Sequence, residues 1–316
     1  MEKPLVTVIT VTYNAARYVR DAVESVLSQQ YANIEYIIGD DCSTDNTWDI
    51  VNEYRDSRIK SYRNQTNLRE YANRNKALEM STGKYILFID GDDLVYPHGL
   101  SYMVTMLEAF PESALAIVGY DCPQYIYPLE FTPEEIYKFQ FFSNGFLSYS
   151  MAGNLFHRSA LKEQGWFPIN FISGDYYVRL KICQKHKCLI IGGNPVWARA
   201  TPGQASIAAG SEKGRAEIFL ISKQFIEDPA CPLNAHNRRQ ALYNTLQPAA
   251  RTIVKNMLML RWNEAISLKK ELGWNWRDVR DYFSATPDRS YMSEYNATHL
   301  LKMDFNKNPY SINYKQ

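Results

Sequence analysis

The sequence lacks several features that mark whole classes of protein. No apolar run approaches the roughly 20 residues of a membrane-spanning helix, and the start, MEKPLVTVITVTYN, does not resemble a signal peptide. Lys plus Arg number 35 against 34 for Asp plus Glu, so no excess positive charge favours a nucleic-acid partner. The five cysteines form no paired framework, and an odd count fits a reducing compartment. These absences predict a cytoplasmic protein that does not bind nucleic acid.

The first half of the chain shows the periodicities of alternating strands and helices. Runs rich in β-branched residues predict strands at 5–12, 34–40, 59–62, 85–89 and 115–121. Helical spacing of apolar residues predicts helices at about 18–27, 48–54, 71–80 and 99–110. Asn14 is expected to cap the first of these helices. This order predicts an α/β fold, a mainly parallel sheet flanked by helices, with its ligand site at the carboxyl ends of the strands.

The second half contains two regions of different character. The aromatic-rich segment 123–149 has no clear period, and is interpreted either as a lid or acceptor wall or as a loop and helix packed on the core. After about Glu212 the patterns are amphipathic and helical. We therefore predict a catalytic domain at 1–211 and a helical extension with an irregular tail at 212–316.

Three roles remain open for the helices of this extension. They are expected to pack on the catalytic domain, because most of a helix's stability comes from burying its apolar face. Pairing with a second subunit is an alternative. Contact with a membrane surface is another, since "RWNEAISLKKELGWNWRDVR" combines tryptophans with basic residues. The sequence predicts no oligomeric state.

An acidic cluster ends one of the predicted strands. In "GKYILFIDGDDLVYP" the residues Asp90, Asp92 and Asp93 fall within four positions. Two like charges about 4 Å apart repel by about 4 kcal/mol at an effective dielectric constant of 20. A divalent cation bound by oxygen ligands, such as magnesium, manganese or calcium, would offset this repulsion. The alternative is a solvated acidic turn, because Asp-Gly is a common turn dipeptide.

The strand ends carry a resemblance to a known family. The segments "VTVITVTYNAARYVRDAVESVLSQQYANIEYIIGDDCSTDNTWDIV" and "NQTNLREYANRNKALEMSTGKYILFIDGDD" resemble the family 2 glycosyltransferases of GT-A fold, of the bacterial surface-polysaccharide type. The resemblance implies a Rossmann-like domain in which Asp41 accepts a hydrogen bond from the nucleotide base, with Val11 and Tyr13 lining the same pocket. An ionised Asp only accepts hydrogen bonds, which suits the N3–H of uracil, so a UDP-linked donor is expected.

The resemblance also implies roles for the acidic cluster and for two arginines. Asp90 is expected to face the ribose or the donor sugar. Asp92 or Asp93 is expected to bind a divalent ion, Mn²⁺ or Mg²⁺, that neutralises the diphosphate, and which of the two contacts the ion stays open. Arg74 is expected to reach the nucleotide, the alternative being a solvent-facing helix arginine. Arg199, in "VWARATPGQAS", is expected to contact the diphosphate.

A second block supplies the candidate general base. "GNLFHRSALKEQGWFPINFISGDYYVRLKI" resembles the family's segment in which a Glu-Asp pair starts a helix, so Asp175 is expected to be the base. The alternative is that Asp175 only caps the helix 176–184. The chain departs from the family at Arg69, where Gly is usual, at Gly174, which replaces the Glu, and at Thr201, which replaces a His. These departures bear on sugar and acceptor choice more than on the fold.

The predicted function is an inverting transfer of a sugar from a nucleotide diphosphate sugar to a hydroxyl of a glycan or lipid-linked acceptor. A nucleotidyltransferase is disfavoured because "TYNAARYVRD", after the first strand, lacks a Gly-rich loop. The remaining alternative is a catalytically inactive GT-A protein that binds glycans or acts as a scaffold. The change to Gly174 supports that alternative, and the intact acidic residues disfavour it. The enzyme is expected in the cytoplasm, with any membrane contact at the cytosolic face.

Overall fold

The fold is organised around one mixed sheet. The structure is a computed structural model and describes residues 3–119, 127–143, 145–148, 151–201 and 210–286. The sheet has the strand order β3-β2-β1-β4-β8-β6-β9-β7. Its strands are β1 (Val6–Thr12), β2 (Ile34–Asp40), β3 (Ile59–Arg63), β4 (Tyr85–Phe88), β6 (Ser113–Val118), β7 (Leu129–Phe131), β8 (Leu155–His157) and β9 (Lys187–Ile191). Strands β3, β2, β1 and β4 run parallel, as do β6 and β9, whereas β8 and β7 are antiparallel to their neighbours. The predicted mainly parallel sheet is confirmed.

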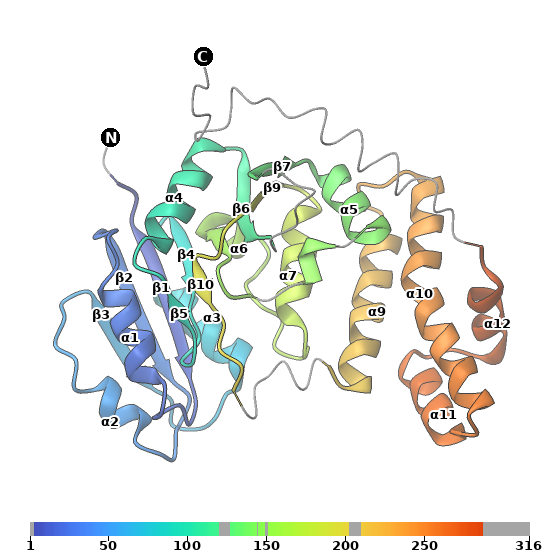
Figure 1. The fold of residues 1–316 in the computed structure, drawn as a ribbon, viewed down its shortest axis with the longest axis horizontal. Helices are drawn as coiled ribbons and strands as arrows, with labels where there is room; N and C mark the ends of the chain where they lie inside the picture. Colours follow the sequence, from blue (N-terminus) through green and yellow to red (C-terminus); the bar gives the residue numbers. More distant parts are fainter. Residues whose placement is uncertain (1–2, 120–126, 144, 149–150, 202–209, 287–316) are drawn as a thin grey trace.

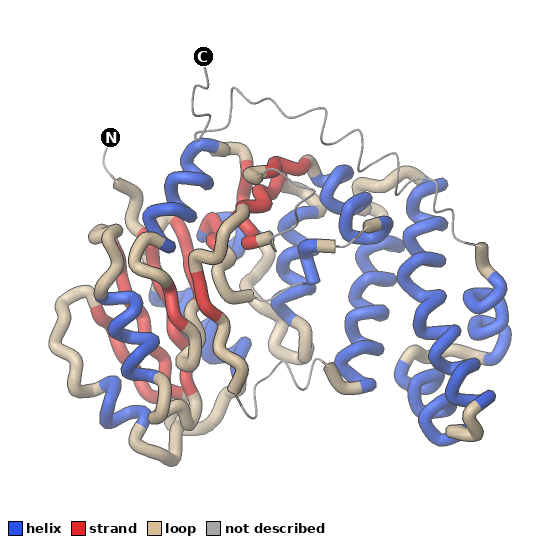
Figure 2. The backbone as a smooth tube through the Cα atoms, in the orientation of Figure 1, coloured by secondary structure: helices blue, strands red, loops and turns tan. Residues whose placement is uncertain are grey.

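Helices cover both faces of the sheet, because successive residues of a strand point to opposite sides. Val8 and Ile38 belong to one buried cluster, and Ile9 and Ile37 to the other. The helices of this part are α1 (Val19–Leu27), α2 (Thr47–Val51), α3 (Glu70–Met80), α4 (Gly99–Ala109), α5 (Pro133–Phe142), α6 (Arg158–Glu163), α7 (Gly174–Cys183) and the short 3₁₀ helix η1 (Phe146–Ser148). Residues of α1 and α4 join the first cluster, and residues of α3 and α7 the second, so the sheet is the middle layer (Figure 2).

The expected helix cap at Asn14 is wrong. Helix α1 begins at Val19, and the residue before it, Tyr18, makes no side-chain cap. Asn14 has a left-handed φ of 49°, which Asn tolerates better than most residues. Its side chain instead accepts a hydrogen bond from the backbone N–H of Thr44, at 2.8 Å, in the loop after β2. A contact thirty residues away in the chain therefore replaces the local cap.

A second, two-stranded sheet joins distant parts of the chain. Strand β5 (Leu94–Val95) pairs antiparallel with β10 (Val196–Trp197). Since β5 follows the acidic cluster directly, this pairing carries residues 198–201 back to that cluster.

The described part of the aromatic-rich segment packs on the core. Phe131, Phe139 and Phe146 are buried, and the rings of Phe139 and Phe146 stack with centroids 4.8 Å apart. The interpretation of a loop and helix packed on the core is confirmed for these residues. Residues 120–126, 144 and 149–150 of the segment lie outside the described part.

The C-terminal helices divide between two cores. They are α9 (Glu212–Glu227), α10 (Ala235–Leu258), α11 (Trp262–Glu271) and α12 (Trp276–Ser284), and they form the right-hand side of Figure 1. On α9, Ile221 and Phe225 pack into the core beside the sheet, whereas Ala216 packs with α10, α11 and α12. The packing of α9 on the catalytic part is thus confirmed, and a domain boundary at residue 211 stays a prediction. In the described part no helix combines the length and apolar character needed to cross a membrane.

Candidate active site

One pocket of about 820 Å³ gathers the predicted site residues. It lies at the carboxyl ends of β1 and β2 and at the end of β4, as expected for an open α/β sheet. The predicted residues that line it are Val11, Tyr13, Asp41, Arg74, Asp90, Asp92, Asp93, Asp175 and Arg199. They come from segments up to 188 positions apart, from 11 to 199, so the fold and not the sequence brings them together.

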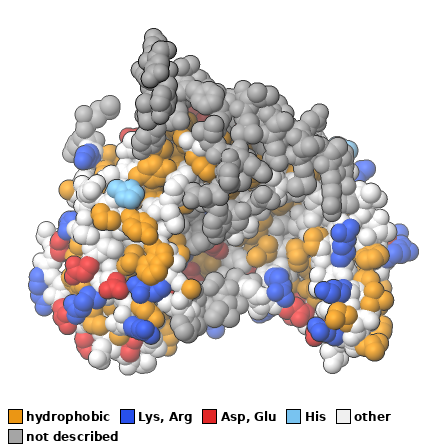
Figure 3. All heavy atoms as spheres, in the orientation of Figure 1, with side chains coloured by type: hydrophobic (Ala, Val, Ile, Leu, Met, Phe, Trp, Pro, Cys, Tyr) orange, Lys and Arg blue, Asp and Glu red, His pale blue; other side chains and the backbone are white. Residues whose placement is uncertain are grey.

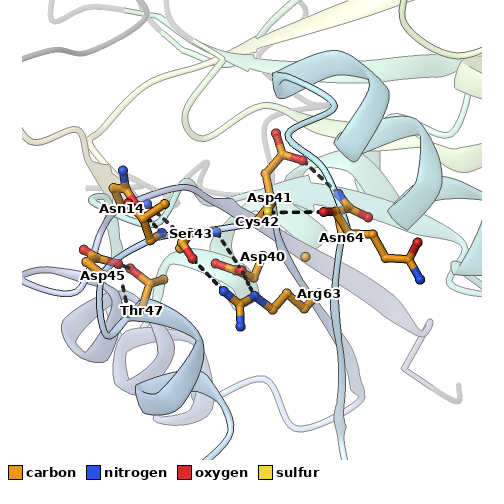
Figure 4. A network of polar contacts seen from close by, with 12 residues as sticks. Asn14, Asp40, Asp41, Cys42, Ser43, Asp45, Thr47, Arg63 and Asn64 are labelled. Carbon is orange, nitrogen blue, oxygen red and sulfur yellow. Dashed lines mark hydrogen bonds and ion pairs between the residues drawn. The ribbon is translucent and has the colours of Figure 1, made fainter.

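The loops after β1 and β2 are tied to each other on one side of the pocket (Figure 4). The backbone N–H of Asn14 donates to Ser43 Oγ at 2.9 Å, and its side chain receives the Thr44 N–H. Buried Asp40 accepts the Ser43 N–H at 3.1 Å and lies 3.4 Å from the Arg63 guanidinium. These contacts fix the strand ends before any ligand binds.

Asp41 is held in place by three protein donors. Its Oδ1 accepts from Asn64 Nδ2 and from the Leu68 N–H, and its Oδ2 accepts from the Arg69 N–H, each at 2.9 Å. A carboxylate oxygen has two acceptor positions, so among the described residues Oδ2 retains one. That position suits an N–H donor of a bound base, and the contact itself stays a prediction.

Arg69 occupies a backbone conformation that normally requires glycine. Its φ of 70° and ψ of 167° fall in a region that residues with a Cβ rarely adopt. The sequence departure at this position therefore appears in the structure as local strain beside Asp41.

Replacing Arg69 with glycine is expected to stabilise the protein. The strained conformation costs about 1–3 kcal/mol, and the greater freedom of glycine in the unfolded chain costs about 0.5–1 kcal/mol. Arg69→Gly should therefore raise the free energy of unfolding by about 1 kcal/mol in urea titrations. Arg69→Ala keeps the strain and serves as the control; an equal gain in both variants would assign the effect to the side chain.

Arg74 is buried inside the pocket wall, which contradicts the alternative of a solvent-facing arginine. Its Nη2 donates to both oxygens of Asp90, at 2.7 and 2.9 Å, and lies 2.9 Å from Glu70. Burial alone would lower the pKa of Arg74, but the charges of Asp90 and Glu70 raise it. Its Nε and Nη1 have no hydrogen-bond partner among the described residues. Both atoms are buried away from the pocket surface, and contact of Arg74 with the nucleotide stays a prediction.

The segment after β10 encloses the other two acidic residues. The Arg199 N–H donates to Asp93 Oδ1 at 2.9 Å, and its Nε donates to the Asp92 carbonyl at 3.0 Å. Thr201, which stands where the family has a His, donates its hydroxyl to Asp92 Oδ2 at 2.6 Å. Arg199 therefore positions the acidic cluster as well as lining the pocket.

The acidic cluster fits a divalent ion held partly by the substrate. Burial, followed by the charges of Asp90 and Asp92, raises the pKa of Asp93 to about 7, so negative charge is unfavourable here without a counter-ion. Over the described ranges, no group of three or more His, Cys, Asp or Glu is arranged to hold a metal. Magnesium typically takes one or two carboxylates together with substrate phosphates. Asp92 and Asp93, with Asp90 held by Arg74, match that donor set.

Asp175 faces the pocket from the first turn of α7. Its Oδ2 accepts from Arg179 Nη2 at 2.7 Å, and the Tyr71 hydroxyl lies 3.4 Å from its Oδ1. The N-cap position of α7 is Ser173, so the alternative that Asp175 caps the helix is wrong. About a fifth of its side chain, 22%, stays exposed to the pocket. A carboxylate that is oriented yet accessible has the properties a general base requires.

The missing Glu at Gly174 has a steric explanation. A Cβ built at this position would lie 2.9 Å from the Tyr71 ring. The Tyr71 hydroxyl also accepts the Asp175 N–H at 3.3 Å and donates to the Ile172 carbonyl at 3.1 Å. Tyr71 thus takes the space beside Asp175 that a side chain at position 174 would need.

A residue of α9 supports the loop that precedes Asp175. Glu217 Oε1 accepts the N–H groups of Ile172 and Ser173, both at 2.7 Å. The neighbouring Ile218 lines the pocket itself. Helix α9 is therefore part of the site's framework.

Removing this support is expected to destabilise the fold. Glu217→Ala leaves two partly buried N–H groups without their acceptor, each worth about 1 kcal/mol, so thermal or urea unfolding should show a loss of about 2 kcal/mol. Glu217→Gln keeps an acceptor oxygen and is expected to lose less than half as much. Equal losses for both variants would show that charge, and not the hydrogen bonds, is responsible.

Four residues in or beside the pocket were not predicted as site residues, although Thr201 was noted as a departure from the family pattern. Glu70, Tyr71, Glu217 and Thr201 all contact predicted site residues or the loop that carries them. Burial and the charges of Asp90 and Asp175 raise the pKa of Glu70, against the lowering effect of Arg74. The spacing of Glu70, four residues before Arg74 on a predicted helix, was the available signal for this ion pair.

Known proteins with similar sequences match about a third of the chain. An E. coli protein, "UDP-Glc:alpha-D-GlcNAc-diphosphoundecaprenol beta-1,3-glucosyltransferase WfaP", is 43% identical over 104 residues, 33% of this chain and 41% of that protein. This relative and two others, both from Bacillus subtilis, are matched over only 37% to 41% of their own length.

Solved structures extend the similarity in fold to most of the chain. The crystal structure of S. aureus TarS 1–349 in complex with UDP-GlcNAc has a TM-score of 0.65 at 21% identity, covering 84% of this chain and 81% of that one. Mannosyltransferase PcManGT from Pyrobaculum calidifontis, in complex with GDP-Man and Mn²⁺, has a TM-score of 0.56 at 21% identity and covers 96% and 87%. These neighbours confirm the expected GT-A-like fold.

The family assignment rests on the segment that carries the strand-end residues. The model of "Glycosyl transferase family 2" matches residues 7–165, half of the 316 residues, and spans β1 through α6 with Asp41, Arg74 and the acidic cluster. The resemblance seen in the sequence is thereby confirmed: this chain belongs to glycosyl transferase family 2.

Proposed function

We propose that this chain transfers a sugar from a UDP-sugar to a hydroxyl of a glycan or lipid-linked acceptor, with inversion at the anomeric carbon. The observation that carries the proposal is the single pocket in which the strand-end carboxylates and Asp175 meet. Two comparisons support the donor: the E. coli relative is named for UDP-Glc, and the TarS structure contains UDP-GlcNAc. The name of the same relative, which includes diphosphoundecaprenol, supports a lipid-linked acceptor.

In this proposal the donor lies along the strand ends. Asp41 accepts the N3–H of uracil, with Val11 and Tyr13 beside it. Arg74 holds Asp90 toward the ribose or sugar. Arg199 contacts the diphosphate. A divalent ion bound through Asp92 and Asp93 would neutralise the charge that develops on the leaving diphosphate.

Asp175 acts on the opposite side of the sugar. Its carboxylate takes the proton of the acceptor hydroxyl while that oxygen attacks the anomeric carbon. The bond from this carbon to the diphosphate oxygen breaks, and the diphosphate leaves with the electron pair. Arg179 and Tyr71 keep the carboxylate oriented during the attack.

The test is release of nucleoside diphosphate from a panel of UDP-, GDP- and dTDP-sugars with Mn²⁺. We expect slow turnover of a UDP-sugar by the wild type, lost in Asp92→Asn. The panel includes GDP-sugars because the PcManGT structure, which has a similar fold, contains GDP-Man. If no sugar nucleotide is bound or turned over, the inactive glycan-binding alternative replaces this proposal.

A further inference from the structure

Exposed apolar side chains concentrate at the turn between α10 and α11. Leu258 and Leu260 are 80% and 79% exposed, and Met259, Trp262 and Ile266 are 49%, 48% and 49% exposed. We call these five residues the apolar tip. Single exposed apolar residues are normal, whereas a contiguous group of this kind marks an interaction site.

The apolar tip is not an unfinished part of the core. Helix α11 already buries one face, where Ala265 and Leu268 pack with α10. Trp262 and Ile266 are four residues apart and so lie together on an exposed side of the helix. Helix α11 therefore packs on the fold without burying these two side chains.

Basic residues lie in and beside the apolar tip in the sequence. Lys255, Arg261 and Lys270 are exposed, and the nearest carboxylate to the Arg261 guanidinium is that of Glu264, at 3.8 Å. Residues 251–284 contain seven Lys or Arg and four Asp or Glu, whereas the whole chain is almost balanced, at 35 and 34. Apolar and Trp side chains next to Lys and Arg are the composition of surfaces that bind anionic bilayers.

The position of the apolar tip in the molecule also favours a bilayer surface as its binding partner. The turn after α10 lies at the lower edge of Figure 1, at the same end of the molecule as the carboxyl ends of β1 and β2, which border the pocket. Figure 3 shows apolar and basic side chains together at the lower right of this face. A second copy of the chain fits less well, since a stable protein interface buries about 800 Å² and about 20–30 residues a side, far more than five side chains at a turn.

We propose that the apolar tip docks on the surface of an anionic lipid bilayer. Leu258 and Leu260 enter the headgroup region, Trp262 lies at the interface, and Lys255 and Arg261 contact anionic headgroups. The chain stays peripheral. This orientation places the carboxyl ends of the strands toward the bilayer, where a lipid-linked acceptor would be presented.

The test is flotation of the full chain with vesicles of phosphatidylcholine, with and without phosphatidylglycerol. We expect binding at least about tenfold tighter to the anionic vesicles, weakened by salt because headgroup attraction is screened. Leu258→Ser/Leu260→Ser should weaken binding at least about tenfold, because both changes remove apolar contact with the bilayer. Leu220→Ser, at an exposed leucine of α9, is the matched control and should bind as the wild type.

Several outcomes would overturn the proposal. These are failure of the wild type to bind anionic vesicles, equal binding by the double variant, and a dimer that the double variant converts to monomer in sedimentation without any vesicle binding. Unchanged thermal unfolding of the double variant shows that the fold is intact, as expected for side chains this exposed. Vesicle binding needs no turnover, so its failure is distinguishable from failure of the proposed sugar transfer.

Discussion

Asp175→Asn is expected to lower kcat for sugar transfer by about 10³-fold while leaving UDP binding within about threefold of the wild type. General-base catalysis contributes about 10²–10⁴-fold, and an asparagine amide cannot take the proton of the acceptor hydroxyl. It can still accept a hydrogen bond from Arg179, and it belongs to α7, not to the strand ends at which the donor is proposed to bind. Initial rates with saturating donor, together with calorimetric titration of UDP, measure both quantities.

The control for this variant is Asp49→Asn. Asp49 is an exposed aspartate that, like Asp175, lies in the first turn of a helix, but it does not line the pocket. Its turnover should equal that of the wild type. A fall in kcat of less than about tenfold in Asp175→Asn would remove this residue as the base.

Arg74→Met is expected to lower the free energy of unfolding by about 3 kcal/mol. Breaking a buried ion pair by removing one partner costs about 3–5 kcal/mol, and we expect the lower end because 38% of the Asp90 side chain and 34% of the Glu70 side chain are exposed. The methionine fills similar volume but leaves both carboxylates without their counter-charge. Urea unfolding of the apo protein measures the loss.

A second substitution separates charge from packing. In Arg74→Met/Asp90→Asn, one of the two carboxylates that lost their counter-charge is replaced by a neutral amide. About 1 kcal/mol or more of the lost free energy of unfolding should therefore be recovered. Arg74→Lys keeps the charge but not the planar fork that binds both Asp90 oxygens, and should fall between the wild type and Arg74→Met. If the double variant is as unstable as Arg74→Met, lost packing against Phe88 and Tyr71 is the cause.

The strand-end part of the site was predictable because of a general property of parallel sheets. Their carboxyl ends meet at one edge, so Asp41 and the acidic cluster could be placed together from the order of elements alone. Asp175 could not be placed this way, and its prediction depended on the resemblance. The structure brings it to the same pocket through contacts with Tyr71, which lies 104 residues away in the chain.

The contacts that were missed share a physical cause: each joins residues distant in sequence. Glu217 accepts hydrogen bonds from residues 44 and 45 positions earlier, and no local pattern on α9 distinguishes it from the other polar residues there. The burial of Arg74 could not be predicted from the apolar pattern either, because the buried face of α3 includes the polar residues Asn73 and Arg74. Apolar periodicity identifies a helix's inner face only when that face is apolar.

The two-part packing of α9 bears on how the chain can be shortened. A fragment that stops at residue 211 removes Ile221, Phe225 and Ile226 from the core beside the sheet, and removes the Glu217 carboxylate that holds Ile172 and Ser173. Such a fragment would expose apolar core surface and aggregate, whatever its chemistry. A minimal catalytic unit for crystallisation or for exchange between enzymes must therefore include α9 and also the start of α10, because Leu233 and Ala241 pack in the same core.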